Sequence, residues 1–323
     1  MSKRLSDVAG FVRFAWRVQR FELTAVVAIG VLAALVAALE AGRLTEVAPP
    51  TSCLLDWITS GGQVNPDCPP VYAWYERNSS EAGKVIGLMM VLPVVIGLIP
   101  GSSLVASEIE HQTAQLAWML APSRRLWLVK RFLLVLFIVI VASSIAAIAS
   151  EWLVSARLPW VGPWSSFNDY GYWGPVVVAR TIAFTSIGVL VGAIVGRQLP
   201  AILVAAIGAI ALFALLNLAR PFGEPLVPVN LHDPGRSDLA IGQQFQATDG
   251  SLLTLQAALA GSPPDLSADQ QTEWLDSHFA RVDIGVPGER LGAVQLRECV
   301  VLIVFATAAT TAAALVVERR RPY

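Results

Sequence analysis

The sequence predicts an all-α integral membrane protein with six transmembrane helices, and composition, apolar runs and charge distribution all support this class. Of the 323 residues, 55% are hydrophobic and only 15% are charged. A soluble chain of this length needs far less apolar surface to build its core. The excess is therefore expected to face lipid.

The apolar runs define the expected spans, because about 20 apolar residues cross the roughly 30 Å hydrocarbon core as a helix. Six segments meet or approach this length: 23–39, 85–105, 132–149, 176–195, 201–218 and 299–317. The first is short, but a long basic and aromatic arm precedes it, unlike the short head of a cleavable secretory signal. We interpret it as a retained span.

The charges indicate the orientation of the spans. With both termini in the cytoplasm, 13 of the 23 Lys and Arg residues but only 5 of the 24 Asp and Glu residues lie on that side. The positive-inside rule favours this arrangement for the N-terminal arm, the short loops and the basic tail, residues 318–323. The sequence thus predicts a multi-pass plasma membrane protein with cytoplasmic termini. No basic groove suggests binding to nucleic acid.

The segments outside the spans have distinct compositions. Residues 1–21 alternate arginines with aromatic side chains, which is typical of an interfacial helix, although a simple basic flank is an alternative. The outer loop 151–174 is rich in Trp and Tyr and is expected to form an interfacial anchor belt; a lateral gate that contacts substrate is the other reading. The largest outer segment, 219–297, precedes the last helix, 298–317, and is expected to contain a short helix beginning at Ser267.

Two cysteines lie in the first outer loop, residues 41–84. Cys53 and Cys68 are in a compartment where disulfides persist, so we predict that they pair, with two unpaired thiols as the alternative. Closing a loop of about 15 residues contributes roughly 3 kcal/mol in the chain-entropy model. Cys299 begins the last span and is expected to be ordinary apolar packing.

The sequence lacks the groups that most catalytic mechanisms need. The chain has no Gly-rich phosphate loop, and the predicted topology separates the three histidines between the two sides of the membrane. Glu108, Glu110 and His111 raise the possibility of an intramembrane metalloprotease, but the other spans offer no further ligands. We predict no catalytic residue and no metal site.

Ionisable residues are rare in the spans. Glu40, Arg180 and Glu298 are near span ends, where their side chains are expected to reach the membrane interface. A proton- or sodium-driven carrier therefore lacks its usual sequence mark.

The segment that follows the second span carries the most specific pattern. A Pro-containing apolar span is followed by two acids in Glu-x-Glu spacing, a Thr three residues later, and Pro-Ser-Arg before a basic-flanked span. This pattern resembles the membrane subunits of ABC-2-type exporters. The matching residues are Glu108, Glu110, Thr113, Leu116, Leu120, Pro122, Ser123, Arg124 and Lys130. The family usually has Gly before the Thr, where this chain has Gln112.

The resemblance implies a permease that pairs with a second permease copy, as a homodimer, and with two copies of a separate ABC ATP-binding subunit. ATP and Mg²⁺ would bind that subunit, and this chain would hold no cofactor. Residues 107–121 would form a coupling helix seated on the ATPase, with the two acids near its N-terminal turn. The residues expected to contact the ATPase are Glu108, Glu110, His111, Gln112, Thr113, Leu116, Leu120 and Arg124.

The predicted function is export of a hydrophobic or amphipathic substrate, such as a drug, lipid or peptide, by alternating access at the dimer interface. The chain would be a transport subunit and not an enzyme. The alternatives are a non-transporting membrane sensor or interaction module, and an ion-coupled carrier.

Overall fold

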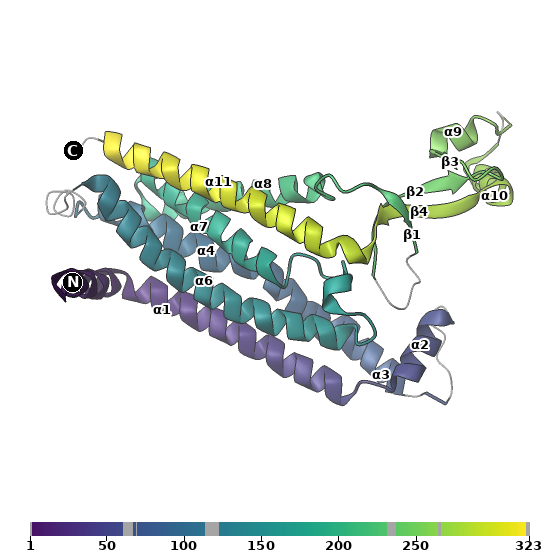
Figure 1. Ribbon diagram of the computed structural model, residues 1–323, viewed down its shortest axis with the longest axis horizontal. Helices are drawn as coiled ribbons and strands as arrows, with labels where there is room; N and C mark the ends of the chain where they lie inside the picture. Colours follow the sequence, from purple (N-terminus) through teal and green to yellow (C-terminus); the bar gives the residue numbers. More distant parts are fainter. Residues whose placement is uncertain are drawn as a thin grey trace.

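The chain folds as a long helical bundle with a small lobe of strands and short helices at one end (Figure 1). A computed structural model describes residues 2–60, 67–68, 70–113, 123–230, 237–263 and 266–320. Among these residues, six helices are long and apolar enough to cross a membrane. The predicted fold class is therefore confirmed.

The membrane-length helices extend beyond the apolar runs that predicted them. They are α1 (Ser2–Glu46), α4 (Gly83–Glu110), α6 (Arg124–Arg157), α7 (Pro175–Val195), α8 (Gln198–Ala219) and α11 (Leu291–Arg319). In α1, α4, α6 and α11 the added turns carry charged and polar side chains, which suit the headgroup layer better than hydrocarbon. Both termini lie at the same end of the bundle, and the lobe lies at the other end (Figure 1).

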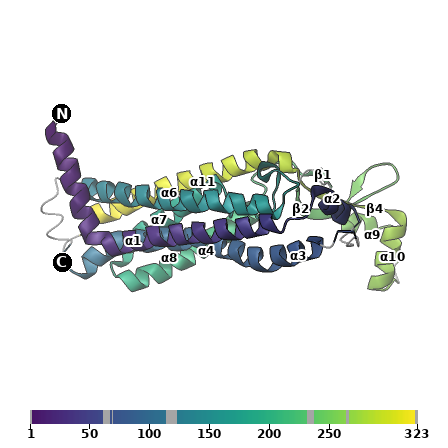
Figure 2. The same ribbon diagram turned by 90° about the horizontal axis from the view of Figure 1, so that it is seen from below.

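The first helix changes direction near its beginning. Gln19 has non-helical dihedral angles, φ −113° and ψ 19°, inside α1. Figure 2 shows the residues before this bend running across the end of the bundle rather than along it. This is the direction expected of an interfacial helix, whose position in the headgroup layer stays a prediction.

Helix α7 lies at the centre of the bundle and is the most enclosed of the six. It packs on α4 through glycines spaced four apart on both helices, Gly97 and Gly101 on α4, and Gly188 and Gly192 on α7. A Cβ at Gly97 would lie 2.5 Å from the carbonyl oxygen of Thr181, and a Cβ at Gly188 would lie 2.8 Å from a backbone nitrogen of α4. Small residues in this spacing let helix backbones approach closely in a membrane.

The segment between α1 and α4, the first predicted outer loop, consists of short helices and contains a disulfide. Helix α2 (Thr51–Thr59) is followed by α3 (Pro70–Arg77) and a π-helical turn, η1 (Asn78–Ala82), which continues into α4. The predicted disulfide is confirmed: Cys53 and Cys68 are bonded, with a Cα–Cα distance of 5.8 Å. Cys299 is a free, half-buried thiol.

The aromatic loop between α6 and α7 differs from the predicted anchor belt. It contains a 3₁₀ turn, η2 (Pro163–Ser165). Trp173 is fully buried and Phe167 and Tyr170 are nearly so, whereas Trp152 and Trp164 are half exposed. Several of these rings therefore fill the core of the bundle at its lobe end. Only the exposed rings, such as Trp152 and Trp164, are available to anchor at the membrane interface.

The lobe adds a four-stranded antiparallel sheet that the sequence did not predict. Its strands are β1 (Val227–Val229), β2 (Leu239–Gln246), β3 (Leu252–Leu253) and β4 (Ala280–Val286), in the order β1-β4-β2-β3. Its helices are α9 (Leu255–Leu259) and α10 (Ala268–His278), and the 3₁₀ turn η3 (Gly288–Arg290) leads into α11. Phe245, Ala258 and Leu275 form its small core.

The predicted short helix is present as α10. The Ser267 side chain accepts a hydrogen bond from the Gln270 backbone N–H, and the Gln270 side chain bonds back to the Ser267 backbone. This reciprocal capping box satisfies backbone donors at the helix start.

Candidate functional site

The end of α4 contains the first four residues predicted for the coupling helix, and there the structure differs from the prediction. Helix α4 continues without a break through Glu110, and His111 is its C-cap. Gln112 then adopts φ 58°, a left-handed conformation that ends the helix. A coupling helix therefore does not begin at Ser107. Leu116 and Leu120, with all of 114–122, lie outside the described residues.

Glu108 is buried in the last turn of α4 and forms an ion pair with Arg131 of α6. Arg131 is only 2% exposed, and its guanidinium lies 5.1 Å from the centre of the Trp127 ring. Glu108 was predicted to lie near the N-terminal turn of an exposed helix; instead it joins two spans. A side chain so enclosed holds α4 and α6 together and is turned away from solvent.

Glu110 lies two residues after Glu108, on a different face of the helix, and is exposed. Its carboxylate accepts a hydrogen bond of 2.8 Å from the backbone N–H of Gln198, the first residue of α8. A negative charge at a helix N-terminus satisfies a free donor and complements the helix dipole. Glu110 thus links α4 to α8.

Three arginines complete the contacts at this end of the bundle. Arg124, at the start of α6, donates to the carbonyl oxygen of Arg320 at 2.6 Å, just after α11. Arg125 pairs with Glu318 of α11 at 2.6 Å. Arg320 in turn donates to the carbonyl oxygen of Ala193 at 2.5 Å, near the end of α7. Positive groups at helix C-termini neutralise exposed carbonyls.

Together these residues form what we call the helix-end cluster: Glu108, Glu110, Arg124, Arg131 and Arg320. Its bonds connect the ends of α4, α6, α7, α8 and α11. The loop from residue 111 to residue 123 leaves and re-enters the bundle within this cluster. His111, Gln112 and Thr113, at the start of the loop, are all exposed.

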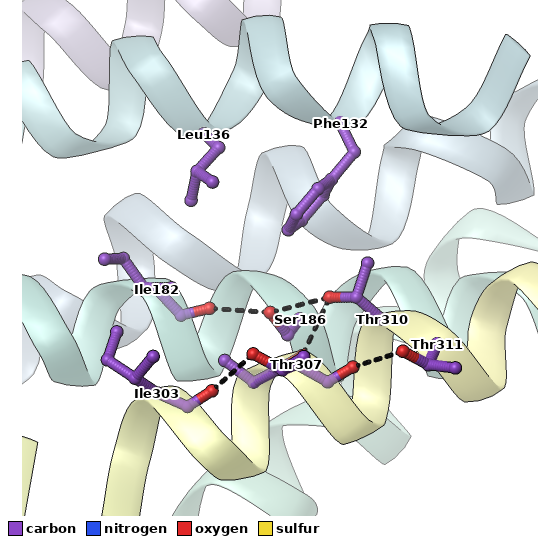
Figure 3. Close-up of a pocket in the computed structure, with 9 residues that line it drawn as sticks. Phe132, Leu136, Ile182, Ser186, Ile303, Thr307, Thr310 and Thr311 are labelled. Carbon is purple, nitrogen blue, oxygen red and sulfur yellow. Dashed lines mark hydrogen bonds between the residues drawn. The ribbon is translucent and has the colours of Figure 1, made fainter. Parts of the chain in front are cut away.

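A second candidate site is a groove between α6 and α11, with α7 as its floor. Towards the termini it holds a cavity of about 300 Å³, and towards the lobe one of about 510 Å³. Both are lined by Ile182 and Ile303, so the two cavities are adjacent along the groove. Figure 3 shows Phe132 and Leu136 of α6 pointing across the first cavity towards α7 and α11.

Hydroxyl groups line the termini-side cavity opposite these apolar side chains (Figure 3). Thr307, Thr310 and Thr311 each donate to the carbonyl oxygen four residues earlier, at 2.8 Å. Ser186 of α7 lies 3.2 Å from the Thr310 hydroxyl. These residues give no sequence signal, because hydroxyl groups at helical spacing are common in spans and form no motif.

One carboxylate lines the lobe-side cavity. Glu151 of α6 lines it, and its Oε1 accepts a 3.0 Å hydrogen bond from the indole N–H of Trp164. Gly174 lines the same cavity.

The ionisable residues expected to reach the membrane interface are buried and paired instead. Arg77 pairs with Glu40 at 2.8 Å, and Arg180 pairs with Glu298 at 2.7 Å. Glu298 also accepts the Tyr170 hydroxyl at 2.7 Å. Burial, followed by the neighbouring Glu298 charge, raises the pKa of Tyr170 well above its usual value, so this phenol stays a donor.

Near this pair, Arg220 stacks on the Tyr170 ring at 4.6 Å. Burial and the nearby Arg180 charge lower the pKa of Arg220. Within the described ranges, no group of three or more His, Cys, Asp or Glu side chains has metal-binding geometry.

Comparison with known proteins identifies one family. The family model described as "ABC-2 membrane transporter related" matches residues 23–220, which is more than half of the chain and covers the helices from α1 to α8. No curated protein and no solved structure matches. The lobe and α11 lie beyond the matched region.

Proposed function

The chain belongs to the ABC-2 membrane transporter related family, and we propose on this basis that it is the permease of an ATP-driven exporter. It is a multi-pass membrane protein and a transport subunit rather than an enzyme. The observation that supports the proposal most is the helix-end cluster, which joins the ends of five of the six spans at the two ends of one loop.

The proposed energy source is a separate ABC ATP-binding subunit, present in two copies, that binds ATP and Mg²⁺. The permease would act as a homodimer with both termini in the cytoplasm, on the side of the helix-end cluster. The basic residues of this end, including Arg124, Arg125 and Arg320, support this orientation.

The loop after α4 is the proposed docking element for the ATPase. Glu110, His111, Gln112 and Thr113 are exposed there and, with Leu116 and Leu120, would form its surface. Glu108 and Arg124 have a different proposed role, since both bond to other helices. They would pass a displacement of the loop to the spans.

Such a displacement would act on several helices together. Ion pairs and helix caps resist separation, so a push on the loop moves the ends of α4 and α6 directly and those of α7, α8 and α11 through the cluster. Rocking of the spans between inward- and outward-open states would then carry a hydrophobic or amphipathic substrate outwards.

The test is an ATPase-association assay with two added charges. The permease is co-expressed with its cognate ATP-binding subunit as wild type and as the double variant His111→Arg/Gln112→Arg. The exposed acid Glu110 favours a positive partner surface, so two added positive charges beside it should repel that surface, weaken association about tenfold and abolish substrate-stimulated hydrolysis. The matched control, Gln246→Arg/Gln256→Arg, adds the same charge to exposed positions on the lobe.

Unchanged association, hydrolysis and transport in the loop variant would refute the proposal. Transport that follows a proton gradient and ignores ATP depletion would identify an ion-coupled carrier. A folded protein that neither binds an ATPase nor moves any solute would favour the sensor or interaction module.

A further inference from the structure

We propose that the groove between α6 and α11 binds cationic amphiphiles, with the positive group beside Glu151 and the apolar body between the two helices. The inference deepens the proposed function and rests on it for its transport meaning, because it names the substrate class of the permease. Binding itself requires neither ATP nor the ATPase.

The walls of the groove suit an apolar body. Phe132 and Leu136 face the termini-side cavity, Ile148 faces the lobe-side cavity, and Ile182 and Ile303 line both. Cavities of about 300 Å³ and 510 Å³ fall in the size range that holds drug-sized ligands. A molecule entering from the lipid would bury its hydrophobic surface here.

The charge of the groove selects the sign of the ligand. Glu151 is the only Asp, Glu, Lys or Arg among the described residues that line either cavity. Its bonding partner is the neutral indole of Trp164, with no Lys or Arg pairing to it in the described part of the chain. The carboxylates of Glu40, Glu108 and Glu298, in contrast, all pair with arginine. An ionisable group that faces a lipid-accessible cavity without a counterion favours a ligand of opposite charge.

The hydrogen-bonding groups point to the same class. The hydroxyl protons of Thr307, Thr310 and Thr311 are engaged, so their oxygens offer lone pairs to a ligand. The lobe-side end offers the Glu151 carboxylate. A ligand with N–H or O–H donors finds acceptors at both ends, whereas an anionic amphiphile would meet acceptors and one negative charge.

The experiment uses two probes of the same size and opposite charge. The purified permease in nanodiscs is titrated with radiolabelled tetraphenylphosphonium and, separately, with tetraphenylborate, in the absence of ATP. Wild type should bind the cation saturably and at least tenfold more tightly than the anion. Glu151→Gln should weaken cation binding about tenfold, equivalent to about 1.4 kcal/mol.

Matched variants separate charge from folding. Glu151→Asp keeps the charge and should retain binding, and Glu81→Gln removes an exposed acid that pairs with Lys84 away from the groove. Ile303→Trp should block the groove at the junction of the two cavities and abolish binding while leaving the fold intact, because Ile303 is 43% exposed. Each variant is first checked for a monodisperse elution profile.

The inference is overturned if wild type binds neither probe saturably, if it binds both equally, or if Glu151→Gln or Ile303→Trp binds like wild type. Saturable, Glu151-dependent binding without ATP-driven transport would overturn the exporter function and leave the binding site standing. ATP-driven transport that is unchanged in Glu151→Gln would support the exporter function and overturn the assignment of this groove as the substrate site.

Discussion

At the scale of single residues, charges within the bundle are used to join helices. Glu108 and Arg131 are the clearest case, since each would be costly to bury alone. Their geometry also leaves one Glu108 oxygen and two Arg131 nitrogens without hydrogen-bond partners among the described residues. The pair therefore specifies which helices meet more than it adds net stability.

This view predicts a strong coupling between the two residues. Glu108→Ala should lower the free energy of unfolding by about 3 kcal/mol, because it leaves the Arg131 guanidinium buried without a counterion. Arg131→Met should cost a similar amount. The double variant should cost clearly less than the sum, as measured by thermal unfolding of the purified protein in a double-mutant cycle. Additive effects would show that the two side chains do not interact in the folded protein.

At the scale of the elements, the contact between α4 and α7 sets how closely the central helices approach. Their glycines remove the side-chain layer that normally separates packed helices, so the two backbones touch. Pro93 and Pro100 both lie in α4, and both are buried against protein rather than exposed to lipid. Backbone carbonyls that the prolines release are thus kept from hydrocarbon.

A side chain in this contact should be poorly tolerated. Gly188→Val places a branched side chain against the α4 backbone, where the first added carbon is already too close. Overpacking of this kind costs about 1–3 kcal/mol or more, so the yield of folded protein should fall sharply. Gly87→Val is the matched control, because no atom of the described residues lies within 4 Å of a Cβ there. Equal yields and melting temperatures for the two variants would contradict the close packing.

At the scale of the whole molecule, the two ends of the bundle have different chemistry. One end carries both termini and the helix-end cluster, and the other carries the disulfide and the lobe (Figure 1). A disulfide is stable outside the cytoplasm and a cluster of arginines is typical of the inner side, so both features favour the proposed orientation.

That orientation is tested by labelling single cysteines. In a background with all three native cysteines replaced by Ser, Ser251→Cys on the lobe should react with a membrane-impermeant maleimide in intact cells. His111→Cys should react only after the membrane is opened. Both positions are exposed, so access and not burial decides the result. Labelling of His111→Cys in intact cells would invert the topology.

The sequence predicted the spans, the disulfide and α10 because each depends on local pattern: apolar run length, a shared compartment, and an N-cap at Ser267. It did not predict the sheet. Strand β2 is exposed along most of its length, so it shows no alternation of apolar and polar residues, and its pairing with β4 depends on residues about 40 positions away.

The candidate sites show the same contrast between features set by local sequence and features set by distant residues. The sequence motif identified three residues that are exposed in the structure: Glu110, His111 and Gln112. The burial of Glu108, in contrast, depends on its partner Arg131 on another helix. Glu151 gave no sequence signal, because its significance depends on which helices flank it. The role of a group that depends on its tertiary neighbours cannot be predicted from a single sequence.

Helix α11 has a consequence that reaches beyond the membrane. It begins directly after β4 and η3, where the Gly288 N–H bonds to Asp238 of the lobe at 2.8 Å, and it ends at the carbonyls held by Arg124. Over 29 residues it is a rod of about 43 Å. A slide or turn of this rod at one end would therefore move the lobe at the other, so in the proposed orientation the outer surface of the cell would carry a mechanical readout of events on the inner side.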